Sequence, residues 1–146
     1  MTSGQGRMNF EPEIVVLYCR QAVGDEASVA VEAEGVSGFR VRAVMVPCSS
    51  KVEIGYILRL LEGGADGVQL VACPEEGCRF LIGSLRSRKR VAYVRGLLAQ
   101  VGIGAERVGI SQKAGLSAKE LVGLAGARAE AVKKLGANPM KKGERK

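Results

Sequence analysis

The sequence contains no histidine and no tryptophan among its 146 residues, and only 4% of them are aromatic. Without histidine the chain cannot form a Ser–His or Cys–His nucleophile, a histidine general base or a histidine-ligated metal site. Three tyrosines and three phenylalanines offer no obvious platform on which single-stranded nucleic acid would stack. Cysteine, of which there are four, therefore has to carry any metal or redox chemistry.

Long apolar runs are also missing. Although 47% of the residues are hydrophobic, no uncharged apolar stretch approaches the roughly 18–20 residues that a bilayer-crossing helix needs. The first residues, Met1–Glu11, are polar and lack the apolar core of a secretory signal. We therefore expect a soluble, cytoplasmic protein with no membrane partner. In that compartment spaced cysteines more often bind metal or perform redox chemistry than form disulfides.

The net charge of +7 is concentrated near the end of the chain. Residues 133–146 hold six basic side chains and one acidic one, whereas the other 132 residues hold 16 and 14. A short lysine-rich terminus is usually a solvated solubility device, so we do not expect nucleic acid as a partner. The length suits one domain. We place that domain at residues 12–135, between a flexible N-terminus at residues 1–11 and a flexible basic tail at residues 136–146.

Four segments rich in apolar and β-branched residues predict strands. They are Glu13–Cys19, Phe39–Val46, Gly67–Cys73 and Arg107–Ser111. Helical patterns follow the second, third and fourth segments, while Gln21–Glu34 is only weakly periodic and is a helix or an irregular crossover. Strands that alternate with helices form a parallel sheet covered on both sides. We therefore predict an α/β fold: a single doubly wound, flavodoxin-like parallel sheet of about four strands, with helices on both faces.

The predicted helices carry boundary signals. Ser50–Glu53 and Ser117–Glu120 each have the spacing of a capping box, in which the serine hydroxyl accepts a backbone N–H and the glutamate bonds back. A core-facing stripe at helical spacing follows the first box: Ile54, Ile57, Leu58 and Leu61. The long helix from about Ser84 to Gln100 is ended by Gly102. Its own stripe consists of Val91, Val94, Leu98 and Val101.

Three cysteines stand at the ends of predicted strands. Cys19 and Cys73 are the last residues of theirs, and Cys48 follows its strand by two residues. Because the carboxyl ends of parallel strands share one edge, where open α/β folds bind ligands, these thiols meet at one rim, and a C-x4-C loop adds Cys78. Four thiolates suit a tetrahedral zinc or an iron–sulfur cluster. The alternatives are small buried apolar cysteines, or a Cys73–Cys78 redox pair, which is less favoured because such pairs are usually C-x-x-C.

Basic residues lie close to these cysteines in the sequence. Three of them would offset the charge of a four-thiolate centre: Arg20, Lys51 and Arg79. The long helix that begins soon after Cys78 carries five more: Arg86, Arg88, Lys89, Arg90 and Arg95. A solvated helix face is the ordinary explanation for such a series. The functional alternative is a partner-docking surface close to the cysteines.

Several segments, spread over roughly Glu13–Ser111, match motifs of a known protein family. The strongest match is Gly64–Val68 followed by Cys73–Phe80, which looks like the family's GADGV lead-in and its GC-x4-C-H-Y loop. Weaker matches to its other motifs are Cys19, Cys48 with Val52, and Gly102–Arg107. The chain thus resembles the delta subunit of methyl-viologen-reducing hydrogenases, an iron–sulfur subunit that partners heterodisulfide reductases.

The sequence also departs from the family's pattern. Ala22 stands where the family has the second cysteine of a C-x-x-C pair, and Arg79 replaces the histidine after the last cysteine. Family members typically carry five cysteines, and this chain carries four. Four is still enough to ligate a [2Fe–2S] cluster. The resemblance therefore implies an electron-transfer subunit whose ligands are Cys19, Cys48, Cys73 and Cys78.

Two hypotheses of function follow. The first is a cytoplasmic electron carrier whose [2Fe–2S] cluster relays electrons between a hydrogenase- or dehydrogenase-type donor and a heterodisulfide-reductase-like flavin or iron–sulfur partner. Such a relay is a subunit of an oxidoreductase complex rather than a stand-alone enzyme. The second is a redox-inert adaptor, zinc-bound or metal-free, that docks in such a complex through its arginine-rich helix and tail.

Overall fold

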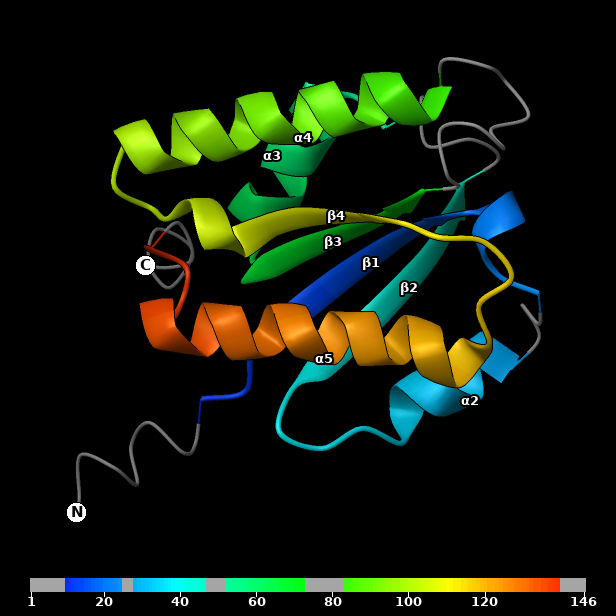
Figure 1. Ribbon diagram of the computed structural model, residues 1–146. Coiled ribbons are helices and arrows are strands. Elements are labelled where there is room, and N and C mark those ends of the chain that lie inside the picture. The colour runs from blue at the N-terminus through cyan, green and yellow to red at the C-terminus, as the bar shows by residue number, and fades with distance from the viewer. Residues whose placement is uncertain (1–9, 25–27, 47–51, 73–82, 140–146) are drawn as a thin grey trace.

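The computed structural model describes residues 10–24, 28–46, 52–72 and 83–139. Within these ranges four strands form one parallel sheet in the order β2-β1-β3-β4 (Figure 1). The strands are β1 (Glu13–Cys19), β2 (Arg40–Val46), β3 (Gly67–Ala72) and β4 (Val108–Gln112). The helices are α2 (Val29–Glu34), α3 (Ile54–Glu62), α4 (Gly83–Gln100) and α5 (Ala118–Leu135), with short turns η1 (Arg20–Ala22) and η4 (Ala105–Arg107). The predicted α/β fold with about four parallel strands is confirmed.

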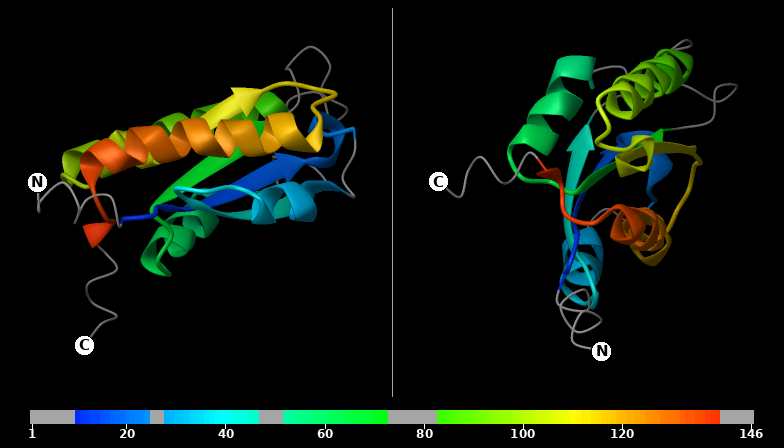
Figure 2. Two further views of the ribbon diagram at one scale, coloured as in Figure 1. Left: turned by 90° about the horizontal axis from the view of Figure 1, so that it is seen from below. Right: turned by 90° about the vertical axis from the view of Figure 1, so that its left-hand side faces the viewer.

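Helices cover both faces of the sheet, as a doubly wound fold requires (Figures 1 and 2). Side chains alternate along each strand, so Ile14 and Val16 of β1 pack in an apolar cluster with α2 and α5. Val15 and Leu17 pack in a second cluster with α3 and α4. Because both faces are covered, β1 and β3 read as continuous apolar runs. The strand order is that of a flavodoxin-like sheet, whose ligand site lies where the carboxyl ends of β1 and β3 diverge.

Helix α3 begins later than its sequence signal predicts. Glu53 is the N-cap residue, with an extended backbone at φ −92° and ψ 160°, and its side chain makes no capping hydrogen bond. The predicted capping box of Ser50 and Glu53 is therefore wrong, and Ser50 itself lies outside the described residues. Val52 explains the shift. Its side chain is buried in the α3/α4 cluster and its carbonyl accepts a hydrogen bond from Arg90 Nη1 at 3.1 Å, which keeps this residue out of the helix.

Other helix boundaries mostly follow their signals. Ser117 and Glu120 form the predicted capping box at the start of α5. Helix α4 ends in a turn at Gly102, whose φ is +81°. That turn carries Ile103 toward the α3/α4 cluster in place of Val101, which is 67% exposed rather than core-facing as predicted. Of the helices that the structure describes, none combines the length and the apolar character that membrane crossing requires.

A buried polar cluster holds the amino edge of the sheet together. Arg107 is 1% exposed, and its guanidinium donates to the main-chain carbonyl of Asp66 at 3.1 Å. Burial lowers the pKa of Arg107, and the charge of Asp66 offsets part of that effect. Because this side chain bonds inward, Arg107 ends η4 instead of opening the strand as predicted. Asn138 is also buried here, so the packed body reaches beyond Leu135.

Candidate functional site

The carboxyl ends of three neighbouring strands are level at one edge of the sheet. Cys19, the last residue of β1, pairs in register with Val46, the last residue of β2. On its other side β1 pairs Tyr18 with Val71, which makes Cys19 level with Ala72, the last residue of β3. Neighbouring strands lie about 4.8 Å apart, so these three strand ends form a compact row.

The predicted ligands continue from this row. Cys48 follows Val46 by two residues in the sequence, and Cys73 directly follows Ala72. Cys19 lies in the part of the chain that the structure describes, whereas five other residues predicted to act here lie outside it: Cys48, Cys73, Cys78, Lys51 and Arg79. Among residues 10–24, 28–46, 52–72 and 83–139, no three Cys, Asp or Glu side chains gather as a metal-binding group. The strand ends are in place, and the donor set remains a prediction.

The Cys19 side chain is enclosed by apolar neighbours. It is 1% exposed and belongs to the same cluster as Ala22, Val23 and Leu116. A thiolate at this position would be shielded from water, and a buried charge of this kind requires a partner such as a metal ion. Arg20, the next residue, is exposed and adds a positive charge at the edge. The surroundings of Cys19 thus fit a sulfur ligand in a site that excludes water.

Sequence reasoning missed one segment that reaches this edge, the β4–α5 turn at residues 113–116. One end of the turn is hydrogen-bonded to Ala22, beyond β1, and the other end to Ala72. Ala22, where the resemblance has a second cysteine, is fully buried. The signal that could have revealed the turn was Gly115, because a glycine between a strand and a capping box marks a tight turn.

The basic residues of α4 divide into two groups. Arg90 and Arg95 bond inside the molecule, through Nη1 atoms that donate to the carbonyls of Val52 at 3.1 Å and Val108 at 2.6 Å. The other three are exposed: Arg86, Arg88 and Lys89. Since α4 leads from the carboxyl end of β3 back to the amino end of β4, these three occupy its half nearer the carboxyl edge (Figure 1). Cations near a helix N-terminus oppose the helix dipole, so they do not stabilise α4 itself.

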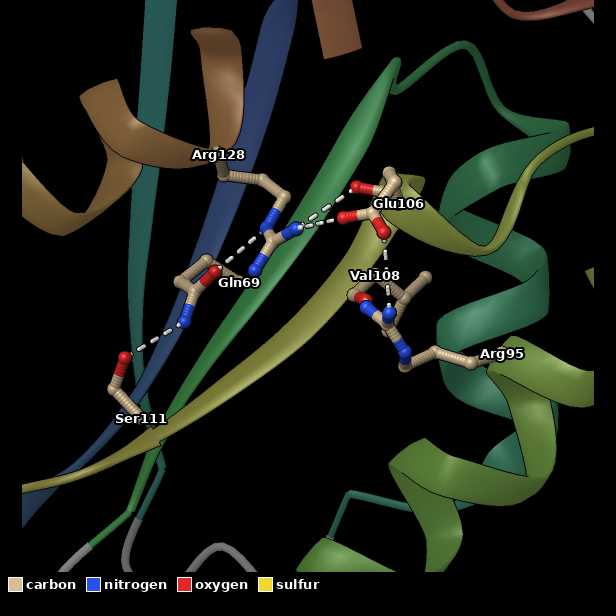
Figure 3. Close-up of polar contacts among 6 residues, drawn as sticks. All are labelled: Gln69, Arg95, Glu106, Val108, Ser111 and Arg128. Carbon is tan, nitrogen blue, oxygen red and sulfur yellow. Dashed lines mark hydrogen bonds and ion pairs between the residues drawn. The ribbon is translucent and has the colours of Figure 1, made fainter. Parts of the chain in front are cut away.

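A polar network on the α5 side of the sheet was also missed. Arg128 Nε donates to Gln69 Oε1 at 2.8 Å, and Gln69 Nε2 donates to Ser111 Oγ at 3.0 Å (Figure 3). Arg128 Nη1 also lies 3.6 Å from Glu106 Oε1. Burial lowers the pKa of Arg128 and the nearby Arg95 lowers it further, while the charge of Glu106 offsets part of the shift.

Gly109 of β4 makes room for this network. A Cβ atom at Gly109 would collide with the guanidinium of Arg128, which lies directly over the strand. Glycine inside a strand often marks such a close approach of another group. Gly109 was therefore the signal that would have revealed the network.

Comparisons with known proteins agree with the geometry of the fold. The family model described as "Methyl-viologen-reducing hydrogenase, delta subunit" matches residues 14–136. The vhu iron-sulfur subunit of the F420-non-reducing hydrogenase of Methanocaldococcus jannaschii is 31% identical over 132 residues, which cover 90% of this chain and 98% of the relative. Its counterpart in Methanococcus maripaludis is 33% identical over 131 residues, with the same coverage of 90% and 98%.

A different kind of relative matches over a smaller share of its length. It belongs to the ferredoxin/F(420)H(2)-dependent CoB-CoM heterodisulfide reductase of Methanosarcina acetivorans, and it is 24% identical over 118 residues. The match covers 68% of this chain and only 15% of that protein. A segment similar to this chain therefore occurs there within a longer polypeptide. Because one family model spans most of the described domain, and full-length relatives exceed 30% identity, the chain belongs to the methyl-viologen-reducing hydrogenase delta subunit family.

Proposed function

We propose that this chain is an electron-transfer subunit that binds a [2Fe–2S] cluster through Cys19, Cys48, Cys73 and Cys78. The observation that carries the proposal is the level row of strand ends at Cys19, Val46 and Ala72, from which three of these cysteines are at most two residues away in the sequence. Relatives named iron-sulfur subunits support the cofactor class. The buried, apolar surroundings of Cys19 support a sulfur ligand there.

The chain's own residues have a limited chemical task in this function. Such a cluster, when bound, supplies the exchange of single electrons. The apolar cluster around Cys19 excludes water, and Arg20 contributes positive charge close to the thiolates. No proton has to be moved, so the absence of histidine is compatible with the role.

We also propose that the partners are a hydrogenase- or dehydrogenase-type donor and a heterodisulfide-reductase-like acceptor. The names of the relatives support both classes, since one group is named for a hydrogenase and another for a heterodisulfide reductase. Arg86, Arg88 and Lys89 form the docking surface, because they are exposed and lie on the half of α4 nearer the carboxyl edge. We exclude Arg90 and Arg95 from it because they bond internal carbonyls. The matching partner surface is acidic, since α4 carries no acidic residue.

The test is an anaerobic purification of the full chain, followed by iron and sulfide analysis. We expect two irons and two sulfides per chain, a visible absorption band that bleaches with dithionite, and a paramagnetic signal in the reduced protein. A chain that stays colourless after reconstitution with iron and sulfide overturns the relay. If such a chain holds zinc or no metal and still binds the partner subunits, it is a redox-inert adaptor instead.

A further inference from the structure

The β4–α5 turn, residues 113–116, is hydrogen-bonded to the segments that continue from both central strands. Leu116 donates its N–H to the carbonyl of Ala22 at 2.8 Å and accepts the N–H of Gly24 at 2.9 Å. Lys113 donates its N–H to the carbonyl of Ala72 at 2.8 Å. One short turn therefore contacts the chain that leaves β1 and the last residue of β3.

These contacts fix directions as well as positions. The Ala72 carbonyl belongs to the planar peptide group that leads into residue 73, so its bond to Lys113 orients the start of that segment. On the other side, Val23 and Leu116 form an isolated parallel bridge. The Leu116 side chain, 9% exposed, packs in the same apolar cluster as Cys19. Leu116 therefore holds the chain after Cys19 through both its backbone and its side chain.

We propose that the β4–α5 turn is a positioning element that sets the separation between the Cys19 thiolate and the segment that starts at Cys73. This inference rests on the proposed function, because the thiolates that it positions are those of the proposed cluster. Groups that orient metal ligands usually contribute about tenfold to a hundredfold in metal affinity. A turn that holds two ligand-bearing segments at once belongs to this class of support.

Gly115 provides a selective way to disturb the turn. Its φ is +70°, in the left-handed region, and a Cβ atom there would meet nothing within 4 Å. A side chain at this position therefore strains the backbone without a collision, and a β-branched residue strains it most. Gly102 is a matched control, with φ +81°, equally open space and a position toward the amino edge. Asparagine tolerates the left-handed region, so Gly115→Asn is the conservative variant.

The experiment compares Gly115→Val, Gly115→Asn and Gly102→Val with the wild-type full chain. Amide hydrogen exchange measures the turn directly, without any cluster. We expect the N–H groups of Lys113, Leu116 and Gly24 to exchange about tenfold faster in Gly115→Val only, because local opening exposes them. Iron retention against a chelator and the paramagnetic spectrum of the reduced protein measure the site. We expect retention to fall about tenfold and the spectrum to broaden in Gly115→Val, while Gly115→Asn and Gly102→Val resemble the wild type.

The outcomes separate the two proposals. A wild-type chain that takes up no iron and sulfide overturns the proposed function, and this inference with it. A wild-type chain that binds the cluster, together with a Gly115→Val variant that retains iron as well as Gly102→Val does, overturns the positioning role alone. Unchanged amide exchange in Gly115→Val also overturns it, because the turn would then not depend on Gly115.

Discussion

The Oδ1 atom of Asp66 accepts the backbone N–H of Asn138 at 2.9 Å. The other carboxylate oxygen accepts the N–H of Glu13, also at 2.9 Å, so one fully buried side chain ties the start of β1 to the segment after α5. The Asn138 amide then donates to the carbonyls of Leu61 and Ala65 at 2.8 and 2.7 Å. The amino edge of the sheet is thus closed by polar contacts between segments far apart in the sequence.

Replacement of Asn138 by alanine tests this closure. The change leaves the carbonyls of Leu61 and Ala65 without their amide donor in a buried place, which costs about 1–3 kcal/mol of unfolding free energy. Urea unfolding at equilibrium measures the difference. Lys134→Ala, at an exposed position on α5, is the control and should change the free energy by less than about 0.5 kcal/mol. Equal effects of the two substitutions would contradict the role of Asn138.

The contact between Gly109 and Arg128 predicts strong non-additivity. Gly109→Ala should displace the guanidinium from Gln69 and Glu106 and cost about 1–3 kcal/mol. In an Arg128→Ala background the same substitution should cost less than about 0.5 kcal/mol, because nothing remains to be displaced. A double-mutant cycle by urea unfolding measures the coupling. Additive free energies would show that Gly109 is not needed for this contact.

Cys19→Ser tests the ligand role against mere burial. The serine hydroxyl would destabilise the fold by about 1–3 kcal/mol at this buried place, and the proposed cluster would lose a thiolate. Ala22→Ser is a matched control, since Ala22 is fully buried in the same apolar cluster. We expect both variants to be less stable in urea, and only Cys19→Ser to lose iron, sulfide and the visible band. Loss of the cluster in both would assign the effect to packing.

Charge reversal on α4 tests the docking surface. Lys89→Glu should weaken binding to the heterodisulfide-reductase-like subunit of the same organism by about fivefold to tenfold at low salt, mainly through slower association. Lys134→Glu makes the same change of charge on another helix and should have little effect. Surface-binding kinetics at several salt concentrations distinguish the two, because added salt should shrink the difference. Equal weakening by both variants would indicate a general charge effect rather than a docking site.

Local patterns predicted most of the fold. The apolar run at Glu13–Cys19 gave the bounds of β1, and the Ser117–Glu120 box gave the start of α5, because each depends on neighbours in the sequence. The Ser50 box failed because the core takes Val52, a tertiary effect that the local pattern does not contain. Helix α2 could not be placed because its six residues have no stripe of their own, and Val29 packs against other elements.

The candidate site was partly predictable for the same reason. Parallel strands share one carboxyl edge whatever their order, so alignment of the strand ends follows from the strand predictions alone. Contacts such as Lys113 with Ala72 join segments distant in the sequence, and only Gly115 hinted at them. The internal bonds of Arg90 and Arg95 were equally hidden, because a basic helix looks the same whether its side chains reach inward or outward.

The bond from Arg95 to the carbonyl of Val108 has a consequence for self-association. β4 is the outer strand on its side of the described sheet, and an outer strand offers its main chain to any similar strand that approaches. Arg95 occupies one of these acceptors, and Arg128 lies across Gly109 beside it. An incoming strand would have to displace one guanidinium and pass close to another. Two arginines thus protect a narrow sheet from edge-to-edge polymerisation.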